Sequence, residues 1–279
     1  MTDKVVVTGM GIVSSIGQNM DEFASSLEGG KCGIANVAAT GERQSPLSIG
    51  AEIRDFSFSR SAQRLSAYSG EFLELAALCT ARAPVFVQTA TIAAMQAWQA
   101  AGLEEKRVAR DRVGIVVAGS NLTDRYQYEF VDRFKKAPEY IPPSFALQFM
   151  DTNLLSVLSE VFGIHGEGFT VGGASASGGV ALVKAGQMIR HGIVDACMVV
   201  GAYADLSPVA LQALINIGAM GGRSYIDRPE KACRPFDAAH EGFIYGQASG
   251  CVILQSLASA QRSKVEILSE LASGVMLLD

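Results

Sequence analysis

The sequence predicts an α/β protein with a buried, largely parallel β-sheet. Residues 113–118 form a continuous apolar run of the kind found in parallel strands that are buried on both faces. Residues 168–171 and 195–201 read as two more strands, and the helical pattern of 176–190 between them completes a βαβ unit. Hydrophobic residues make up 49% of the chain and charged residues only 18%, below the typical ~25%, so a compact fold is expected and global disorder is excluded.

The elements before this sheet are predicted from strand and capping signals. Residues 4–17 predict a β-branched strand that ends in a glycine-rich turn. A helix should begin at Met20, with Asn19 as its N-cap and Gly29 as its end. A longer helix is expected over 87–101, where apolar residues recur at helical spacing.

The remaining elements follow the same reasoning. Residues 121–150 are rich in aromatic residues and predict a long excursion from the scaffold, a kind of segment that is often functional. A helix over 153–162 should be closed by Gly163. A last strand is expected over 265–275.

Composition and charge exclude several functions. The net charge is −5, and the densest basic pair is Lys135-Lys136, so no Lys/Arg cluster supports nucleic-acid binding. No apolar run approaches the ~18 to 20 residues of a membrane span. Asp3 and Lys4 stand directly before the first strand, so no signal peptide is expected.

Cysteine usage points to a reducing compartment. The five cysteines are scattered and lack metal-ligand spacing, so we expect no metal site and a cytoplasmic location. Each cysteine is interpreted as a small buried hydrophobe.

The glycines near the N-terminus do not form a dinucleotide-binding fingerprint. That motif is Gly-x-Gly-x-x-Gly, and here Gly9 and Gly11 are followed by Ser14, with the next glycine at Gly17. We therefore interpret these glycines as forming a tight backbone turn.

A candidate active site lies in the turn between the strand 168–171 and the helix 176–190. Residues 172–177 read Gly-Gly-Ala-Ser-Ala-Ser, and small residues let a substrate approach the backbone. A residue at a helix N-terminus faces unpaired N–H groups and the positive end of the helix dipole. Ser175 is therefore a candidate catalytic residue whose backbone N–H would bind an oxyanion. The structural alternative is a plain turn in which a serine caps the helix.

A serine hydrolase is a further alternative. The Gly-x-Ser-x-Gly elbow of that class ends in glycine, where this chain has Ser177. Asp205 or Asp237, followed by His240, supply an acid and a base in the required order. Order alone does not bring them close to Ser175.

Several segments together resemble the β-ketoacyl synthases of fatty-acid and polyketide assembly. In chain order they are residues 5–17 with 27–34, 113–117, 162–166, 169–178, and Arg234-Pro235-Phe236-Asp237 followed by Gly242-Phe243. The resemblance implies a thiolase-like αβαβα layered fold of two similar halves and a habit of homodimerisation. It also implies substrates carried on the phosphopantetheine arm of an acyl carrier protein, with no bound cofactor. Gly173, Ala174 and Phe236 are expected to contact substrate.

One departure from the family decides the expected chemistry. Condensing members carry their acyl-accepting cysteine in a Thr-Ala-Cys-x-Ser pattern, which falls on residues 173–177 and puts Ser175 at the cysteine position. A helix terminus can convert a thiol to a thiolate, whereas a serine without an oriented base stays a poor nucleophile. We therefore expect condensation to fail. Decarboxylation of a malonyl thioester needs no acyl-enzyme, and the chain resembles the stand-alone decarboxylases of polyketide β-branching cassettes, which form acetyl-carrier protein.

A second departure concerns histidine. The family's two histidine motifs belong to its second half and do not occur in this chain. The histidines present are expected in a turn, at a helix end and in a loop: His165, His191 and His240. Residues 1–255 are expected to form the N-terminal half, and 256–279 the start of a truncated C-terminal half. The strand 265–275 should then belong to a sheet whose other strands are missing, which predicts aggregation or an obligate partner.

Two functions follow from the sequence. The favoured one is a malonyl-carrier-protein decarboxylase whose histidines come from another polypeptide or from unrecorded sequence. The alternative is a catalytically silent ketosynthase-like subunit, which pairs with an active subunit or docks a carrier protein. In both cases the partners are an acyl carrier protein and further ketosynthase chains in a homodimer or hetero-oligomer, with no nucleic acid and no membrane.

Overall fold

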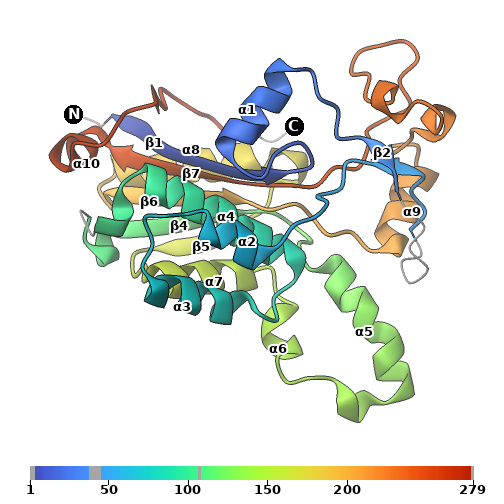
Figure 1. The fold of residues 1–279 in the computed structure, drawn as a ribbon, viewed down its shortest axis with the longest axis horizontal. Helices are drawn as coiled ribbons and strands as arrows, with labels where there is room; N and C mark the ends of the chain where they lie inside the picture. Colours follow the sequence, from blue (N-terminus) through green and yellow to red (C-terminus); the bar gives the residue numbers. More distant parts are fainter. Residues whose placement is uncertain (1–3, 38–44, 106–107, 278–279) are drawn as a thin grey trace.

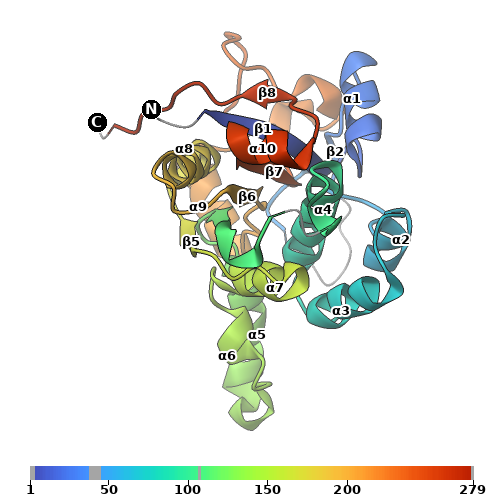
Figure 2. The ribbon, with the colours of Figure 1, turned by 90° about the vertical axis from the view of Figure 1, so that its left-hand side faces the viewer.

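A six-stranded mixed sheet separates two layers of helices in the computed structural model, which describes residues 4–37, 45–105 and 108–277 (Figures 1 and 2). The strand order is β5-β4-β6-β7-β1-β8, in which β4 runs parallel to β5 and β6 and the other pairs are antiparallel. The strands are β1 (Val5–Ser14), β4 (Val113–Ala118), β5 (Gly168–Val171), β6 (Ala196–Gly201), β7 (Ala248–Ser256) and β8 (Ser269–Glu270). A separate two-stranded sheet pairs β2 (Ala35–Asn36) with β3 (Ile49–Gly50).

Helices cover both faces of the large sheet. The helices of the described residues are α1 (Met20–Glu28), α2 (Phe58–Gln63), α3 (Gly70–Thr80), α4 (Val85–Ala100), α5 (Asp124–Lys136), α6 (Phe145–Gln148), α7 (Asn153–Phe162), α8 (Ser177–Arg190), α9 (Pro208–Asn216) and α10 (Leu257–Ser263). Helices α4 and α8 lie on opposite faces (Figure 2). Strand residues alternate between these faces: Ile115 and Met198 pack in the cluster that includes α4, and Val116 and Val199 in the cluster that includes α8.

The predicted helix over 87–101 is confirmed as α4, which begins two residues earlier. Met95 and Trp98 are fully buried, and the Trp98 ring packs on Phe162 of α7 with the ring centroids 4.9 Å apart. The prediction for α1 also holds, because the Asn19 side chain accepts a hydrogen bond from the Glu22 N–H at 2.9 Å.

The predicted glycine turn at the N-terminus is wrong. Strand β1 runs through Gly9 and Gly11 to Ser14 without a turn. Both glycines face α4: a Cβ at Gly9 would lie 2.1 Å from the Ala97 carbonyl oxygen, and one at Gly11 would lie 2.1 Å from the Ala93 carbonyl oxygen. They are needed because the helix packs directly on the strand backbone.

The βαβ region matches the prediction closely. Strands 113–118 and 168–171 have the expected bounds, and α7 ends at Gly163, whose φ of 58° is left-handed. The helix predicted over 176–190 is α8, which starts one residue later after a 3₁₀ turn. In the βαβ unit formed by β5, α8 and β6, the two strands are not neighbours, because β4 lies between them in the sheet.

The strand predicted over 265–275 is wrong in length and partner. Only Ser269–Glu270 is a strand, and it pairs with Val6 and Val7 at the edge of the same sheet rather than in another sheet. The Leu271 N–H still donates to the Val5 carbonyl oxygen at 2.9 Å, and the Arg190 guanidinium, from α8, donates hydrogen bonds to the Leu271 and Ala272 carbonyl oxygens, at 2.7 and 3.1 Å. The division into two halves at residue 255 stays a prediction.

Residues 121–150 form the expected excursion. Helices α5 and α6 extend away from the layered body (Figures 1 and 2). The excursion has its own aromatic cluster, in which the Phe145 ring stacks on Tyr126 and on Phe149 at centroid distances of 5.6 and 5.5 Å. Among the residues described, no helix has the length and apolar character to cross a membrane.

The cysteines differ in burial. Cys197 and Cys251 are buried as expected, and burial raises the pKa of both thiols. Cys79 is half-buried. Cys32 and Cys233 are exposed, so the expectation of a small buried hydrophobe is wrong for these two, which lie in loops outside the sheet.

Candidate active site

The carboxyl ends of three parallel strands meet at one edge of the sheet. Ala118 of β4 lies opposite Val171 of β5 and opposite Gly201 of β6. The segments that follow these strands therefore come together: residues 119–122, 172–176 and 202–205. Open α/β sheets characteristically bind ligands outside the carboxyl ends of their strands.

A cavity of about 330 Å³ lies at this edge, and we call it the Ser175 cavity. Its lining consists of small residues and one leucine: Ala118, Gly119, Ser120, Leu122, Ala174, Ser175, Ser177, Gly178, Gly201, Ala202, Ala204 and Ala248. Of the residues predicted to be functional, Ser175 and Ala174 line the cavity. Gly173 and Phe236 are not part of its lining.

Ser177 fixes the shape of the turn that carries Ser175. Its Oγ accepts a hydrogen bond from the Gly173 N–H at 2.9 Å and donates one to the Ala174 carbonyl oxygen at 2.7 Å. Ala174 is held at φ 45°, a left-handed conformation uncommon for a residue with a Cβ. The N-cap of α8 is Ala176, which makes no side-chain cap hydrogen bond, so the alternative of a serine cap is wrong.

Ser175 itself is exposed, two residues before α8. Neither its Oγ nor its backbone N–H makes a hydrogen bond to another residue in the described part of the chain. A free N–H beside the N-terminus of a 14-residue helix faces the positive end of the helix dipole. This arrangement can stabilise negative charge that develops on a bound carbonyl oxygen.

The wall formed by residues 119–122 is fixed at both ends. The Gly119 N–H donates to the Val171 carbonyl oxygen at 3.0 Å. The Asp151 carboxylate accepts hydrogen bonds from the N–H groups of Asn121 and Leu122, at 3.0 and 2.9 Å. Sequence reasoning missed Asp151, because the contact joins the two ends of the excursion and leaves no local pattern.

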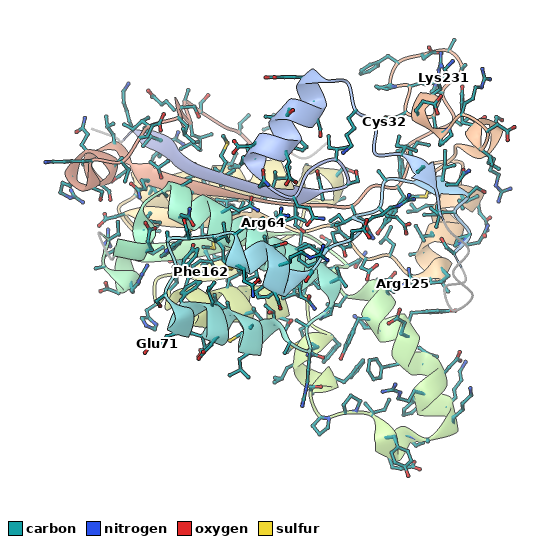
Figure 3. The ribbon with its side chains drawn as sticks, in the orientation of Figure 1. Cys32, Arg64, Glu71, Arg125, Phe162 and Lys231 are labelled. Carbon is teal, nitrogen blue, oxygen red and sulfur yellow. The ribbon has the colours of Figure 1, made fainter. Side chains whose placement is uncertain are left out.

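The wall formed by residues 202–205 is also held by neighbouring elements. The Tyr245 hydroxyl donates to the Ala204 carbonyl oxygen at 3.1 Å. Burial raises the pKa of Tyr245 to about 12, so the phenol stays protonated at neutral pH and keeps this hydrogen bond. The N–H of Arg125, which lies where α5 leaves the body (Figure 3), donates to the Asp205 carbonyl oxygen at 2.8 Å.

Phe236 lies in a loop that is ordered by its neighbours. Its side chain is fully exposed and its φ is 65°. The Arg234 guanidinium bonds the Asp237 carboxylate at 2.7 Å and holds the pKa of that carboxyl below its usual range. His240 Nδ1 lies 2.7 Å from the Asp237 carbonyl oxygen. A substrate contact for Phe236 therefore stays a prediction.

A second cavity, of about 360 Å³, gathers four cationic side chains, and we call it the basic cavity. The cations are Lys31, Arg54, Arg60 and Arg64, partly offset by Glu22 and Asp55. The sequence shows no basic cluster because these residues come from separate segments that only the fold brings together. Ser14 also lines this cavity, and its partner across the β1–β7 pair is Ala248 of the Ser175 cavity.

Solved ketosynthase structures share this architecture. A β-ketoacyl synthase from Burkholderia phymatum STM815 matches with a TM-score of 0.80 at 20% identity, over 96% of this chain and 62% of that protein. The ishigamide ketosynthase/chain length factor matches with a TM-score of 0.80 at 24% identity, over 98% of this chain and 63% of that protein. The fold is therefore the thiolase-like ketosynthase fold that the sequence predicts.

The chain belongs to the β-ketoacyl synthase family. The family model "Beta-ketoacyl synthase, N-terminal domain" matches residues 2–260. The polyketide biosynthesis malonyl-ACP decarboxylase PksF of Bacillus subtilis (strain 168) is 37% identical over 276 residues, which are 99% of this chain and 63% of that protein. The 3-oxoacyl-[acyl-carrier-protein] synthase 2 of Coxiella burnetii (strain RSA 493 / Nine Mile phase I) is 27% identical, over 96% of this chain and 61% of that protein. The chain thus spans less than two thirds of the length of these relatives.

Proposed function

We propose that this chain is the N-terminal ketosynthase part of an enzyme that decarboxylates malonyl groups on an acyl carrier protein to acetyl groups, in polyketide or fatty-acid biosynthesis. The observation that carries the proposal is Ser175, which stands at the family's cysteine position in the lining of the Ser175 cavity, with an N–H that bonds no other described residue. The similarity to a protein named as a malonyl-ACP decarboxylase supports the same reaction.

The chemistry follows from the groups present. Loss of CO₂ breaks the bond between the malonyl carboxylate and the α-carbon, and the electron pair of that bond forms a thioester enolate. The Ser175 N–H and the positive end of α8 stabilise the charge that develops on the thioester oxygen. A proton from solvent then gives the acetyl thioester. No acyl-serine is needed, and the Ser175 Oγ contacts no base among the residues described.

The basic cavity supports a substrate carried on a phosphopantetheine arm. Its cationic side chains match the phosphodiester of such an arm. Ser14 of the basic cavity and Ala248 of the Ser175 cavity are paired across neighbouring strands, whose Cα atoms are about 5 Å apart. The two cavities therefore have lining residues at the same end of the β1–β7 pair, and we place the phosphate of the arm at the basic cavity and its thioester at the Ser175 cavity.

The histidines of the reaction are expected from a second ketosynthase half on another polypeptide or in further sequence, within a homodimer or a hetero-oligomer in the cytoplasm. The three histidines of this chain lie outside the lining of the Ser175 cavity. This observation also favours the second candidate, a catalytically silent subunit that docks a carrier protein. It gives no support to a serine hydrolase, which needs a histidine at Ser175.

Incubation with malonyl-acyl carrier protein, read by intact mass, tests the proposal. Decarboxylation predicts loss of CO₂ and formation of acetyl-acyl carrier protein, with only a modest effect of Ser175→Ala because the backbone N–H remains. A silent subunit predicts carrier binding without loss of CO₂, even after a candidate second half is added. A hydrolase predicts release of the free acid from the carrier, and its complete loss in Ser175→Ala.

A further inference from the structure

One hydroxyl of the Ser175 cavity has no role in the chemistry above. Three serine side chains line the cavity, and Ser177 uses its hydroxyl within the turn. Ser120 Oγ makes no hydrogen bond to another residue of the described ranges. It faces the turn segment, because a Cβ at Gly172 would lie 2.5 Å from this oxygen.

The position of Ser120 is fixed by its neighbours. The preceding residue, Gly119, is bonded to the end of β5, and the two following residues are bonded to the Asp151 carboxylate. The backbone on both sides of the exposed Ser120 is therefore fixed at the cavity wall.

The rest of the lining makes this hydroxyl selective. Apart from the serines, every lining side chain is apolar or absent, and none carries a charge. A hydroxyl without a partner disfavours an alkyl chain, because binding the chain would leave the hydroxyl desolvated and unpaired. A carboxylate accepts the hydrogen bond instead. The absence of a cation from this lining suits decarboxylation, because an ion pair would stabilise the carboxylate before it leaves and slow the reaction.

We propose that Ser120 Oγ–H donates a hydrogen bond to the free carboxylate of the malonyl group, and that Ser120 thereby selects carboxylated acyl groups over alkyl groups of similar size. This assignment rests on the proposed function, which supplies a malonyl thioester as the ligand. The charge-assisted hydrogen bond orients the carboxylate without the strong ground-state binding of an ion pair.

Binding measurements test the assignment without catalysis. Dissociation constants of malonyl and butyryl pantetheine analogues, with an amide in place of the thioester, are measured by calorimetry on this chain. The unchanged chain should bind the malonyl analogue more tightly. Ser120→Ala should reduce that preference by about tenfold to a hundredfold, because a hydrogen bond to a charged group contributes about 1.5–3 kcal/mol. Ser120→Thr, which keeps the hydroxyl, should retain most of it.

A matched control is Ser156→Ala on α7, an exposed serine outside this cavity whose Oγ bonds the Thr152 carbonyl oxygen. It should leave the preference unchanged. An unchanged preference in Ser120→Ala, or equal binding of the two analogues by the unchanged chain, would overturn the assignment. If the chain decarboxylates malonyl-acyl carrier protein but Ser120→Ala keeps the preference for the malonyl analogue, only the role of Ser120 is rejected. A Ser120-dependent preference without loss of CO₂ rejects only the proposed function.

Discussion

The Ser177 hydroxyl oxygen accepts a hydrogen bond from the Gly173 N–H at 2.9 Å and so ties the start of α8 to the turn that presents Ser175. Ser177→Ala should lower the free energy of unfolding by about 1 kcal/mol, because the Gly173 N–H loses its partner. It should also reduce decarboxylation more than Ser175→Ala does, since the free N–H is no longer held in place. Urea unfolding and single-turnover rates measure the two effects, and a larger rate loss in Ser175→Ala would contradict this view of the turn.

Ser175→Cys should restore acyl loading without restoring condensation. A thiol beside the N-terminus of α8 is a far better nucleophile than a hydroxyl, because the helix terminus favours the thiolate. Intact mass after incubation with an acyl thioester should show a covalent acyl group on the variant and none on the unchanged chain or on Ser175→Ala. Acylation of the unchanged chain at Ser175 would refute the argument that this serine lacks an activating base.

Gly9→Ala should destabilise the fold by about 3 kcal/mol, at the upper end of overpacking effects. The added methyl group would lie 2.1 Å from the Ala97 carbonyl oxygen and would push α4 off β1. Gly70→Ala is a matched control, because a Cβ at that helical position meets nothing within 4 Å and should leave stability equal or slightly higher. Thermal unfolding of both variants tests the packing, and equal melting temperatures would count against it.

Arg60→Glu combined with Arg64→Glu should weaken binding of malonyl-acyl carrier protein by roughly tenfold at low salt, with the difference shrinking as salt screens the charges. Arg262→Glu on α10 reverses the charge of a side chain outside the basic cavity and should have little effect on this binding. Fluorescence anisotropy at several salt concentrations measures the binding. A salt-independent affinity would argue against a phosphate contact in the basic cavity.

Glu241 should make stability depend on pH. Its carboxylate accepts hydrogen bonds from the Gly222 and Ser224 N–H groups at 3.0 and 3.3 Å, and the bonds from Ser224 and Gly222 lower the pKa of the carboxyl. The stabilisation is therefore complete above the ordinary glutamate pKa of about 4.3 and is lost as the pH falls through the lower folded-state value. Urea midpoints should separate Glu241→Gln from the unchanged chain at pH 7 and converge in strong acid. A constant difference at all pH values would show that the charge is not the cause.

Local signals explain which elements the sequence could predict. The apolar run at 113–118 and the left-handed Gly163 act within a few residues, and both strand and helix end have the expected bounds. Gly9 and Gly11 were misinterpreted because their role is set by α4, about 85 residues further along the chain. The C-terminal strand is shorter than predicted, and the carbonyl oxygens after it bond the Arg190 side chain of α8, a contact that leaves no local pattern in the sequence.

The same distinction applies to the site. Ser175 is a candidate from the sequence because its turn aligns with a family motif, and the structure places it in the lining of a cavity. Ser120 and Asp151 could not be found from the sequence. Ser120 lies at the cavity through the register of β4 against β5, and Asp151 holds the cavity wall through hydrogen bonds across the excursion. The basic cavity was missed for the same reason, since charge clusters that form in space leave no cluster in the sequence.

The Asp151 carboxylate, by binding the N–H groups of two residues at the start of the excursion, closes residues 121–150 into a loop. The entropy of closing such a loop changes only slowly with its length. The excursion is therefore a module whose length and sequence can diverge among relatives while the sheet register stays the same. Evolution can reshape this arm beyond Asp124 and Arg125, which bond residues 205 and 207, without disturbing the strands that lead to the Ser175 turn.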